Sequence, residues 1–178
     1  MTDLASVRRL SEEAAAVDIL VDNAGTYEFA MTADQTVASY DEMFQVNVRA
    51  PYFLTAAIAP RMAARGGGSV VNIGSMAAHI GMASTSVYAA TKAALTSLTR
   101  TWAAEFGPSG VRVNLVAPGP TLTASVPEEN ASAVGATTLL HRHALPQEIA
   151  AAVVFLASPQ ASYLTGATIP VDGGRTIA

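Results

Sequence analysis

Short apolar segments alternate along the chain with longer segments of helical periodicity. In most of the short segments, apolar residues adjoin one another instead of occupying only every second position, which is typical of strands buried on both faces. These segments are residues 17–21, 69–74, 111–116 and 167–171, and helical patterns cover 3–15, 36–64, 84–106 and 147–157. The alternation predicts the α/β class, with a parallel sheet covered by helices on both faces.

Length and composition limit the organisation of the chain. Its 178 residues are enough for one sizeable core but few for two, so we expect a single domain over residues 1–178. Apolar residues make up 51% and charged residues 13%, the net charge is -4, and the cationic side chains are not clustered. This composition argues against nucleic-acid binding and favours buried contacts between subunits.

Residue types exclude several kinds of site. The chain has no cysteine, which rules out disulfides, thiolate catalysis and cysteine-ligated zinc. His141 and His143 offer two imidazoles without a third ligand nearby, so we predict a solvated turn and no metal site. No apolar run reaches the roughly 18 residues of a membrane helix, and no signal-peptide pattern opens the chain, so we expect a cytoplasmic protein without a membrane partner.

Lys92 is the only lysine in the chain, and Tyr88 precedes it by four positions in a helical pattern. Four positions are just over one helical turn, so the phenol and the ammonium group are expected on the same helix face. All other cationic side chains are arginines, which cannot release a proton, whereas a lysine is a compact and tunable charge. The pair is a candidate for proton chemistry; the alternative is a surface pair without a role.

Pro51 lies inside the helical pattern of residues 36–64. A proline ring clashes with the carbonyl four residues earlier, here that of Asn47, so we expect a kink and a carbonyl without a helical partner. Such a carbonyl beside an asparagine side chain can hold a water molecule. Alternatively, Asn47 merely tolerates the kink.

Several short motifs occur in a characteristic order and spacing from about residue 3 to residue 174. They are Asn23-Ala24-Gly25 after a strand, Asn47, Gly74-Ser75, Tyr88-x-x-x-Lys92, Pro118-Gly119 and Val171-Asp172-Gly173-Gly174. Together they resemble the short-chain dehydrogenase/reductase family, in particular its 3-oxoacyl-carrier-protein reductase-like members. The resemblance implies a Rossmann-like sheet and an NAD(P)-dependent oxidoreductase that transfers hydride between a nicotinamide cofactor and a carbonyl or alcohol.

The resemblance also implies roles for four residues. Tyr88 would be the general acid/base, and Ser75 would bind the substrate oxygen. Lys92 would hold the nicotinamide ribose, and its ammonium about 4 Å away would lower the tyrosine pKa from about 10 toward neutrality. Asn47 would fix a water that leads protons to Lys92.

Two further segments would contact the cofactor. By resemblance, Asn23, Ala24 and Gly25 approach its adenosine side, and Pro118, Gly119, Thr121 and Thr123 approach its nicotinamide end. The family usually has a second asparagine where this chain has Asp22. A carboxylate there would either repel a cofactor phosphate or replace a structural hydrogen bond, and we favour the second interpretation.

The family's first three strands and its glycine-rich, phosphate-binding turn have no match in this sequence. The resemblance therefore implies an N-terminally truncated member, whose preference between NAD and NADP is not encoded in these residues. Residues 19–21 would form an exposed edge strand. We expect the chain alone to bind dinucleotide weakly, or to pair this edge with another chain.

Two functions fit these observations. The first is the reductase itself; the second is a cofactor-deficient, non-catalytic protein that retains the family's oligomerisation surface. In either case we expect a homodimer or homotetramer formed through helices 36–64 and 84–106. Residues 124–140 are expected to form a mobile lid over a small carbonyl or alcohol substrate, whose identity the composition does not indicate.

Overall fold

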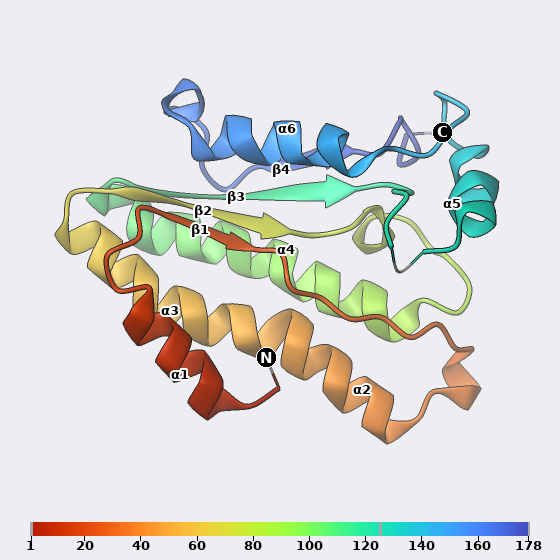
Figure 1. Cartoon of the computed structure of the whole chain (residues 1–178), viewed down its shortest axis with the longest axis horizontal. Coiled ribbons are helices and arrows are strands. Elements are labelled where there is room, and N and C mark those ends of the chain that lie inside the picture. The colour runs from red at the N-terminus through yellow and green to blue at the C-terminus, as the bar shows by residue number, and fades with distance from the viewer. Residues whose placement is uncertain (1, 125, 178) are drawn as a thin grey trace.

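Four parallel strands form a sheet in the computed structural model, which describes residues 2–124 and 126–177. The strand order is β1-β2-β3-β4 (Figure 1). The strands span Ile19–Asp22 (β1), Gly68–Ile73 (β2), Val111–Pro118 (β3) and Thr168–Val171 (β4). Their pairings are all parallel, so the carboxyl ends of the strands lie at the same end of the sheet. The predicted strands and class are confirmed.

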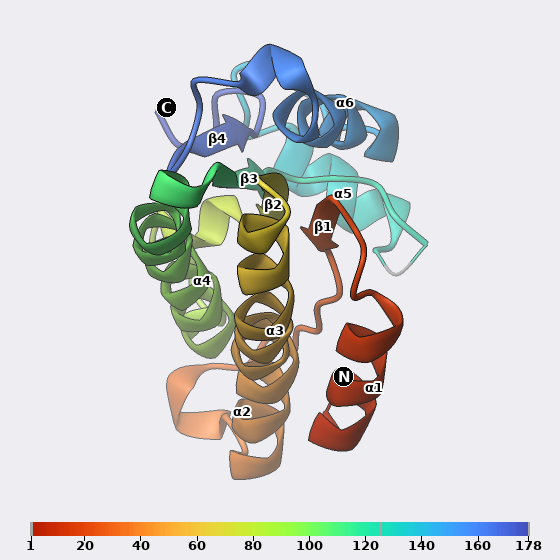
Figure 2. The same ribbon diagram turned by 90° about the vertical axis from the view of Figure 1, so that its left-hand side faces the viewer.

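Helices cover both faces of the sheet, as predicted. Helices α1, α3 and α4 lie on one face and α6 on the other, as two perpendicular views show (Figures 1 and 2). The helices span Leu4–Glu13 (α1), Val37–Phe44 (α2), Ala50–Ala64 (α3), Ser86–Phe106 (α4), Glu128–Gly135 (α5) and Pro146–Ala157 (α6).

The strands contribute side chains to two apolar cores. Val70 packs with residues of α3 and α4, among them Leu54 and Leu95. Val71, the next residue of β2, packs on the opposite face against Leu156 of α6. Both valines are fully buried. Consecutive apolar residues are therefore needed because each strand is buried on both faces.

Strand β1 lies at the edge of the sheet, next to β2. Within the described residues, no strand pairs with its outer side. Ile19 and Val21 are 50% and 41% exposed, whereas Leu20 packs against the core under α3 and α4. The predicted exposed edge strand is confirmed.

Pro51 divides the predicted helix 36–64. Between α2 and α3, residues Gln45–Arg49 form a π-helical segment, in which the Ala50 N–H donates to the Gln45 carbonyl five positions back. Because Pro51 has no N–H, the regular α-helical hydrogen bonds cannot continue through this turn. The predicted irregularity is thus a π-helical segment, and it carries the buried Asn47.

The predicted lid is more regular than expected. Helix α5, Glu128–Gly135, lies within residues 124–140, where the sequence predicted a loop. Two glutamates occupy its first turn, where negative charge stabilises a helix.

In the part of the chain that the structure describes, no helix combines the length and apolar character needed to cross a bilayer.

Candidate active site

Tyr88 lies in the first turn of α4, near the carboxyl end of β2. The side chain of Ser75 interacts with the Tyr88 phenol and acts to lower its pKa. Ser75 follows β2 and begins the short 3-10 helix Met76–Ala78, whose Ala77 N–H donates to the Ser75 hydroxyl oxygen at 3.1 Å. The end of a strand and the start of a helix therefore bring the two predicted hydroxyl groups together.

Lys92 lies one turn further along α4 and is 5% exposed. Its Nζ donates to the carbonyl of Ile73, the last residue of β2, at 2.9 Å, and lies 5.8 Å from the centre of the Tyr88 ring. The prediction that Tyr88 and Lys92 share a helix face is confirmed. The bond to Ile73 fixes the ammonium group at the end of the sheet.

The protonation of the pair differs from the expectation. Burial raises the pKa of Tyr88, and the interaction with the Ser75 side chain opposes this only in part. Burial also lowers the pKa of Lys92 to about 8. The predicted lowering of the tyrosine pKa by Lys92 is therefore wrong for this structure: the ammonium is held by the Ile73 carbonyl, and desolvation of the phenol outweighs its attraction.

Asn47 is buried in the π-helical segment, and its side-chain amide is fully engaged. Its Nδ2 donates to the Thr26 carbonyl at 2.8 Å and to Thr91 Oγ1 at 3.1 Å, and its Oδ1 accepts from the Thr26 N–H at 2.9 Å. The side chain thus ties the segment after β1 to α4. Thr26 and Thr91 were not predicted, since their contacts with Asn47 span 21 and 44 positions.

The two predicted cofactor segments lie on either side of β2, because β1 and β3 are its neighbours. Asn23, Ala24 and Gly25 follow β1 and are exposed. A methyl group on Gly25 would lie 3.5 Å from both Lys92 Nζ and Asn47 Oδ1, so this turn runs past the buried ammonium.

The second segment continues from the end of β3. Pro118 is the last residue of that strand, and the Gly119 N–H donates to the carbonyl of Val171 at 3.0 Å. Thr121 Oγ1 donates to the Gly119 carbonyl at 3.1 Å, and Thr123 is exposed. A methyl group on Gly119 would lie 2.6 Å from the Asp172 Cα, so this glycine also permits close packing of the two strand ends.

Comparisons with known proteins agree with this geometry. The family described as "Enoyl-(Acyl carrier protein) reductase" matches residues 4–176. A solved structure described as a short chain dehydrogenase/reductase family protein is 57% identical, with a TM-score of 0.95, over 99% of this chain and 74% of that one. The chain belongs to the short-chain dehydrogenase/reductase family.

Other members of the short-chain dehydrogenase/reductase family are similar over the same region. D-xylose 1-dehydrogenase of Caulobacter vibrioides is 39% identical over 98% of this chain and 72% of its own length. The blue fluorescent protein from a metagenomic library, solved in complex with NADPH, is 37% identical with a TM-score of 0.92, over 98% of this chain and 72% of that chain. This chain thus spans about three quarters of the length of these relatives.

The residues present fit one end of the dinucleotide that short-chain dehydrogenases/reductases use. Lys92 carries ammonium donors suited to ribose hydroxyls, and Gly25 has no side chain to fill the space beside the Lys92 Nζ. The phosphate end has no comparable site: residues 2–124 and 126–177 contain no glycine-rich turn leading from a strand into a helix. The residues present therefore fit a ribose but not the phosphates of the dinucleotide.

Asp22, which replaces the usual asparagine of short-chain dehydrogenases/reductases, is 6% exposed at the end of β1. Its Oδ2 accepts a hydrogen bond from Thr55 Oγ1 of α3 at 3.4 Å. Burial raises the pKa of this carboxyl group to about 7. Its position inside the fold fits the structural interpretation, in which it replaces a hydrogen bond between elements.

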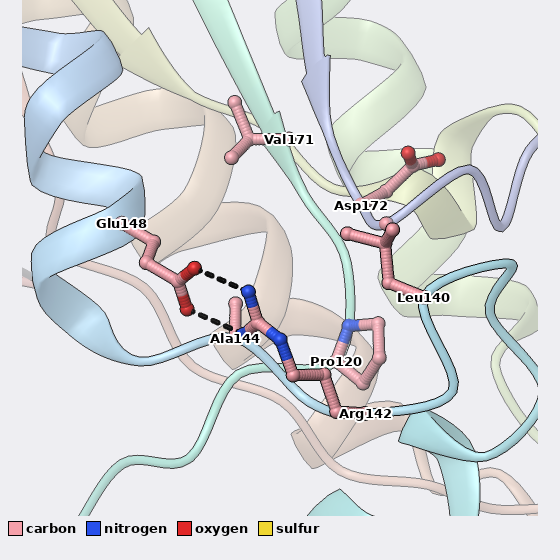
Figure 3. A pocket seen from close by; sticks show the side chains of 8 residues that line it. Pro120, Leu140, Arg142, Ala144, Glu148, Val171 and Asp172 are labelled. Carbon is pink, nitrogen blue, oxygen red and sulfur yellow. Dashed lines mark hydrogen bonds and ion pairs between the residues drawn. The ribbon is translucent and has the colours of Figure 1, made fainter.

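A pocket of about 80 Å³ lies beside the carboxyl ends of β3 and β4 (Figure 3). Its lining contains none of the four predicted catalytic residues; it consists of Pro120, Leu140, Arg142, Ala144, Glu148, Val171, Asp172 and Gly173. Arg142 donates to both carboxylate oxygens of Glu148, at 2.7 and 2.8 Å. The Leu145 N–H donates to the same carboxylate at 2.8 Å, so the ion pair anchors the start of α6.

This ion pair was not predicted from the sequence, which indicated a solvated turn at residues 141–143. His141 is exposed there, and His143 Nδ1 lies 3.3 Å from Ser132 Oγ of α5. No group of three histidine, aspartate or glutamate side chains suited to a metal ion occurs among residues 2–124 and 126–177.

Proposed function

We propose that this chain carries the proton-transfer centre of an NAD(P)-dependent oxidoreductase that interconverts a carbonyl compound and an alcohol. The observation that carries the proposal is the buried ammonium of Lys92, 5.8 Å from the centre of the Tyr88 ring on the same helix face, with the Ser75 side chain interacting with the phenol. Two adjacent hydroxyls can bind one carbonyl oxygen, and one of them can donate its proton. The cofactor supplies the hydride when it is bound.

Each residue then has a distinct role. The Ser75 hydroxyl donates to the substrate oxygen and orients it toward Tyr88. Tyr88 transfers its proton to that oxygen as the carbonyl is reduced, and accepts it in the reverse reaction. Lys92 binds the ribose hydroxyls, with its ammonium held in place by the Ile73 carbonyl. Asn47 is a positioning residue, because its amide holds the segment after β1 next to Lys92.

The pKa shifts favour carbonyl reduction at neutral pH. Because burial raises the pKa of Tyr88, the phenol is protonated and ready to donate. Because the pKa of Lys92 is about 8, its ammonium remains mostly charged below that pH. Alcohol oxidation needs the phenolate, which this environment disfavours, so the reverse reaction should require higher pH.

NAD or NADP is the cofactor we propose, on the basis of Lys92 and the small residues after β1, and of a relative solved with NADPH. The 178-residue chain should bind either dinucleotide with a dissociation constant above the low micromolar range. The reason is that it offers the ribose site but no glycine-rich turn for the phosphates. Isothermal titration calorimetry with NADH and NADPH measures this directly.

The Lys92→Met variant tests whether Lys92 supplies the remaining affinity for the dinucleotide. If the ribose site supplies the residual affinity, this substitution should weaken binding further, although α4 keeps its length and apolar packing. Low micromolar binding by a monomeric chain would contradict the prediction.

We also propose a homo-oligomer formed through α2, α3 and α4, within the helices predicted for this role. Tyr52 and Phe53 of α3 are 44% and 46% exposed, and the Tyr52 ring lies 6.1 Å from that of Trp102 in α4. Exposed aromatic residues of this kind are enriched in the cores of protein interfaces. Sedimentation velocity tests the proposal, and a monomer at micromolar concentration would oppose it.

A non-catalytic assembly protein is the second candidate. The exposed edge of β1, with Ile19 and Val21, favours it. The two functions share the oligomerisation surface and differ in turnover. Reduction of a ketone that depends on Tyr88, measured at millimolar cofactor to offset weak binding, supports the enzyme; no reduction under these conditions supports the second candidate.

A further inference from the structure

Two aromatic side chains stand next to Tyr88 on the segment that follows β1. The rings of Tyr27 and Phe29 stack with their centroids 5.0 Å apart and their planes at 27°. Each also meets the Tyr88 ring edge-on, at 6.3 and 6.1 Å between centroids and interplanar angles of 74° and 81°. Tyr27 and Phe29 thus form a stacked pair of rings that is roughly perpendicular to the Tyr88 ring; we call this pair the aromatic slab.

The aromatic slab remains accessible although it is large and apolar. Tyr27 is 40% exposed and Phe29 is 56% exposed, and Met31 beyond them is 57% exposed. Leaving apolar surface of this size in contact with water costs free energy. Exposed apolar patches of this kind often mark a binding site. Exposed aromatic groups beside a reactive hydroxyl are therefore candidates for contact with a ligand.

The aromatic slab is held in place at both ends. Asn47 exchanges two hydrogen bonds with the backbone of Thr26, just before it. Just after it, the Ala30 N–H donates to the carbonyl of Ser84, in the loop that leads into α4, at 3.0 Å. Both anchors belong to elements that also carry site residues, so the slab keeps its position relative to Tyr88.

We propose that the aromatic slab binds the substituent of the carbonyl substrate and selects a neutral, planar, apolar one, as in an aryl ketone. The proposal rests on the function proposed above, because the carbonyl oxygen must lie on Ser75 and Tyr88 for its substituent to reach the slab. A planar substituent can stack on one ring face while its carbonyl accepts hydrogen bonds. The exposed Glu28 lies between the two rings in sequence and opposes an anionic substituent by repulsion.

The test compares probes that share a carbonyl but differ in the substituent. The dissociation constants of acetophenone, acetone and D-xylose are measured by ligand-observed NMR titration on the 178-residue chain. The double variant Tyr27→Ala/Phe29→Ala should bind acetophenone about tenfold more weakly than the native chain, since the aromatic contacts are lost. The affinities for acetone and D-xylose should not change.

Tyr163→Ala is the matched control, because Tyr163 is fully exposed on another part of the surface. Phe29→Leu keeps the apolar volume but removes the flat face, so it should weaken acetophenone binding even if the double variant does not fold. Unchanged acetophenone affinity in both slab variants would overturn the proposal. An equal loss in Tyr163→Ala, or an equal loss of D-xylose binding, would also overturn it.

The binding assay separates this proposal from the proposed function, because it needs no cofactor and no turnover. Loss of acetophenone binding in the slab variants, together with ketone reduction that is insensitive to Tyr88→Phe, would keep the slab as a ligand site and refute the catalytic role. Ketone reduction that requires Tyr88, with acetophenone binding unchanged in the slab variants, would do the reverse.

Discussion

Replacing Tyr88 with phenylalanine should slow ketone reduction by about 10²- to 10⁴-fold, the usual contribution of a positioned general acid. The substitution removes one hydroxyl and keeps the ring, including its edge-on contacts with Tyr27 and Phe29. The loss should therefore appear in kcat more than in KM, because proton donation is needed only as the carbonyl is reduced. Oxidation of the reduced nicotinamide, followed by its absorbance, measures the rate.

The matched control is Tyr163→Phe, which removes a hydroxyl from a fully exposed side chain and should leave the rate unchanged. Far-ultraviolet circular dichroism of both variants establishes that the fold is retained. A Tyr88→Phe variant that keeps a rate within a factor of about three of the native chain would show that Tyr88 is not the general acid.

Replacing Asp22 with asparagine should raise the free energy of unfolding at pH 8 by on the order of 4 kcal/mol. Burial raises the pKa of the Asp22 carboxyl to about 7 from a usual value of 3.8. Above pH 7 the folded protein must therefore hold a buried carboxylate, and within the described residues this carboxylate accepts a hydrogen bond from the hydroxyl of Thr55. An amide at position 22 carries no charge, so it avoids the cost of burying a carboxylate.

The stabilisation expected from Asp22→Asn should depend on pH. Between about pH 4 and pH 7 the folded protein keeps a proton on Asp22 that the unfolded chain has released, so its free energy of unfolding falls as pH rises. Below about pH 4 both states are protonated, and the advantage of the amide should vanish. Urea unfolding across this range measures the difference between the native chain and Asp22→Asn.

A further contribution comes from the neighbouring strand. Asn72 of β2 is the register partner of Asp22, and its buried Oδ1 has no hydrogen-bond partner in the structure. The amide introduced at position 22 brings a donor next to this acceptor at every pH, whereas the carboxyl group of Asp22 offers a donor only while it is protonated. Asp41→Asn, at an exposed carboxylate of α2, is the control. If Asp22→Asn raised the free energy of unfolding by the same amount at pH 8 and at pH 4, this would contradict the assignment of the proton to Asp22.

The strands and most helices could be predicted because burial leaves a direct pattern in the sequence. Within residues 69–74, Val70 and Val71 are both apolar because they face different cores. The break near Asn47 was also predictable, because Pro51 cannot continue the hydrogen-bond ladder. In both cases the cause lies within a few residues of its effect.

Interactions between distant residues could not be predicted in the same way. The bond from Lys92 to the Ile73 carbonyl spans 19 positions, and the burial that raises the pKa of Tyr88 arises only in the folded chain. The ion pair of Arg142 with Glu148 depends on how the chain turns before α6. Helix α5 was missed because its small and polar residues give no apolar stripe.

The central claim is that Ser75 and Tyr88 act as one unit on a single carbonyl oxygen. A double-mutant cycle with Ser75→Ala, Tyr88→Phe and both together, measured as kcat/KM for ketone reduction, tests it most directly. If the unit is real, the double variant should be about as slow as Tyr88→Phe alone, because the oxygen that Ser75 orients no longer receives a proton. Losses that multiply would show that the two hydroxyls act independently and would contradict the claim.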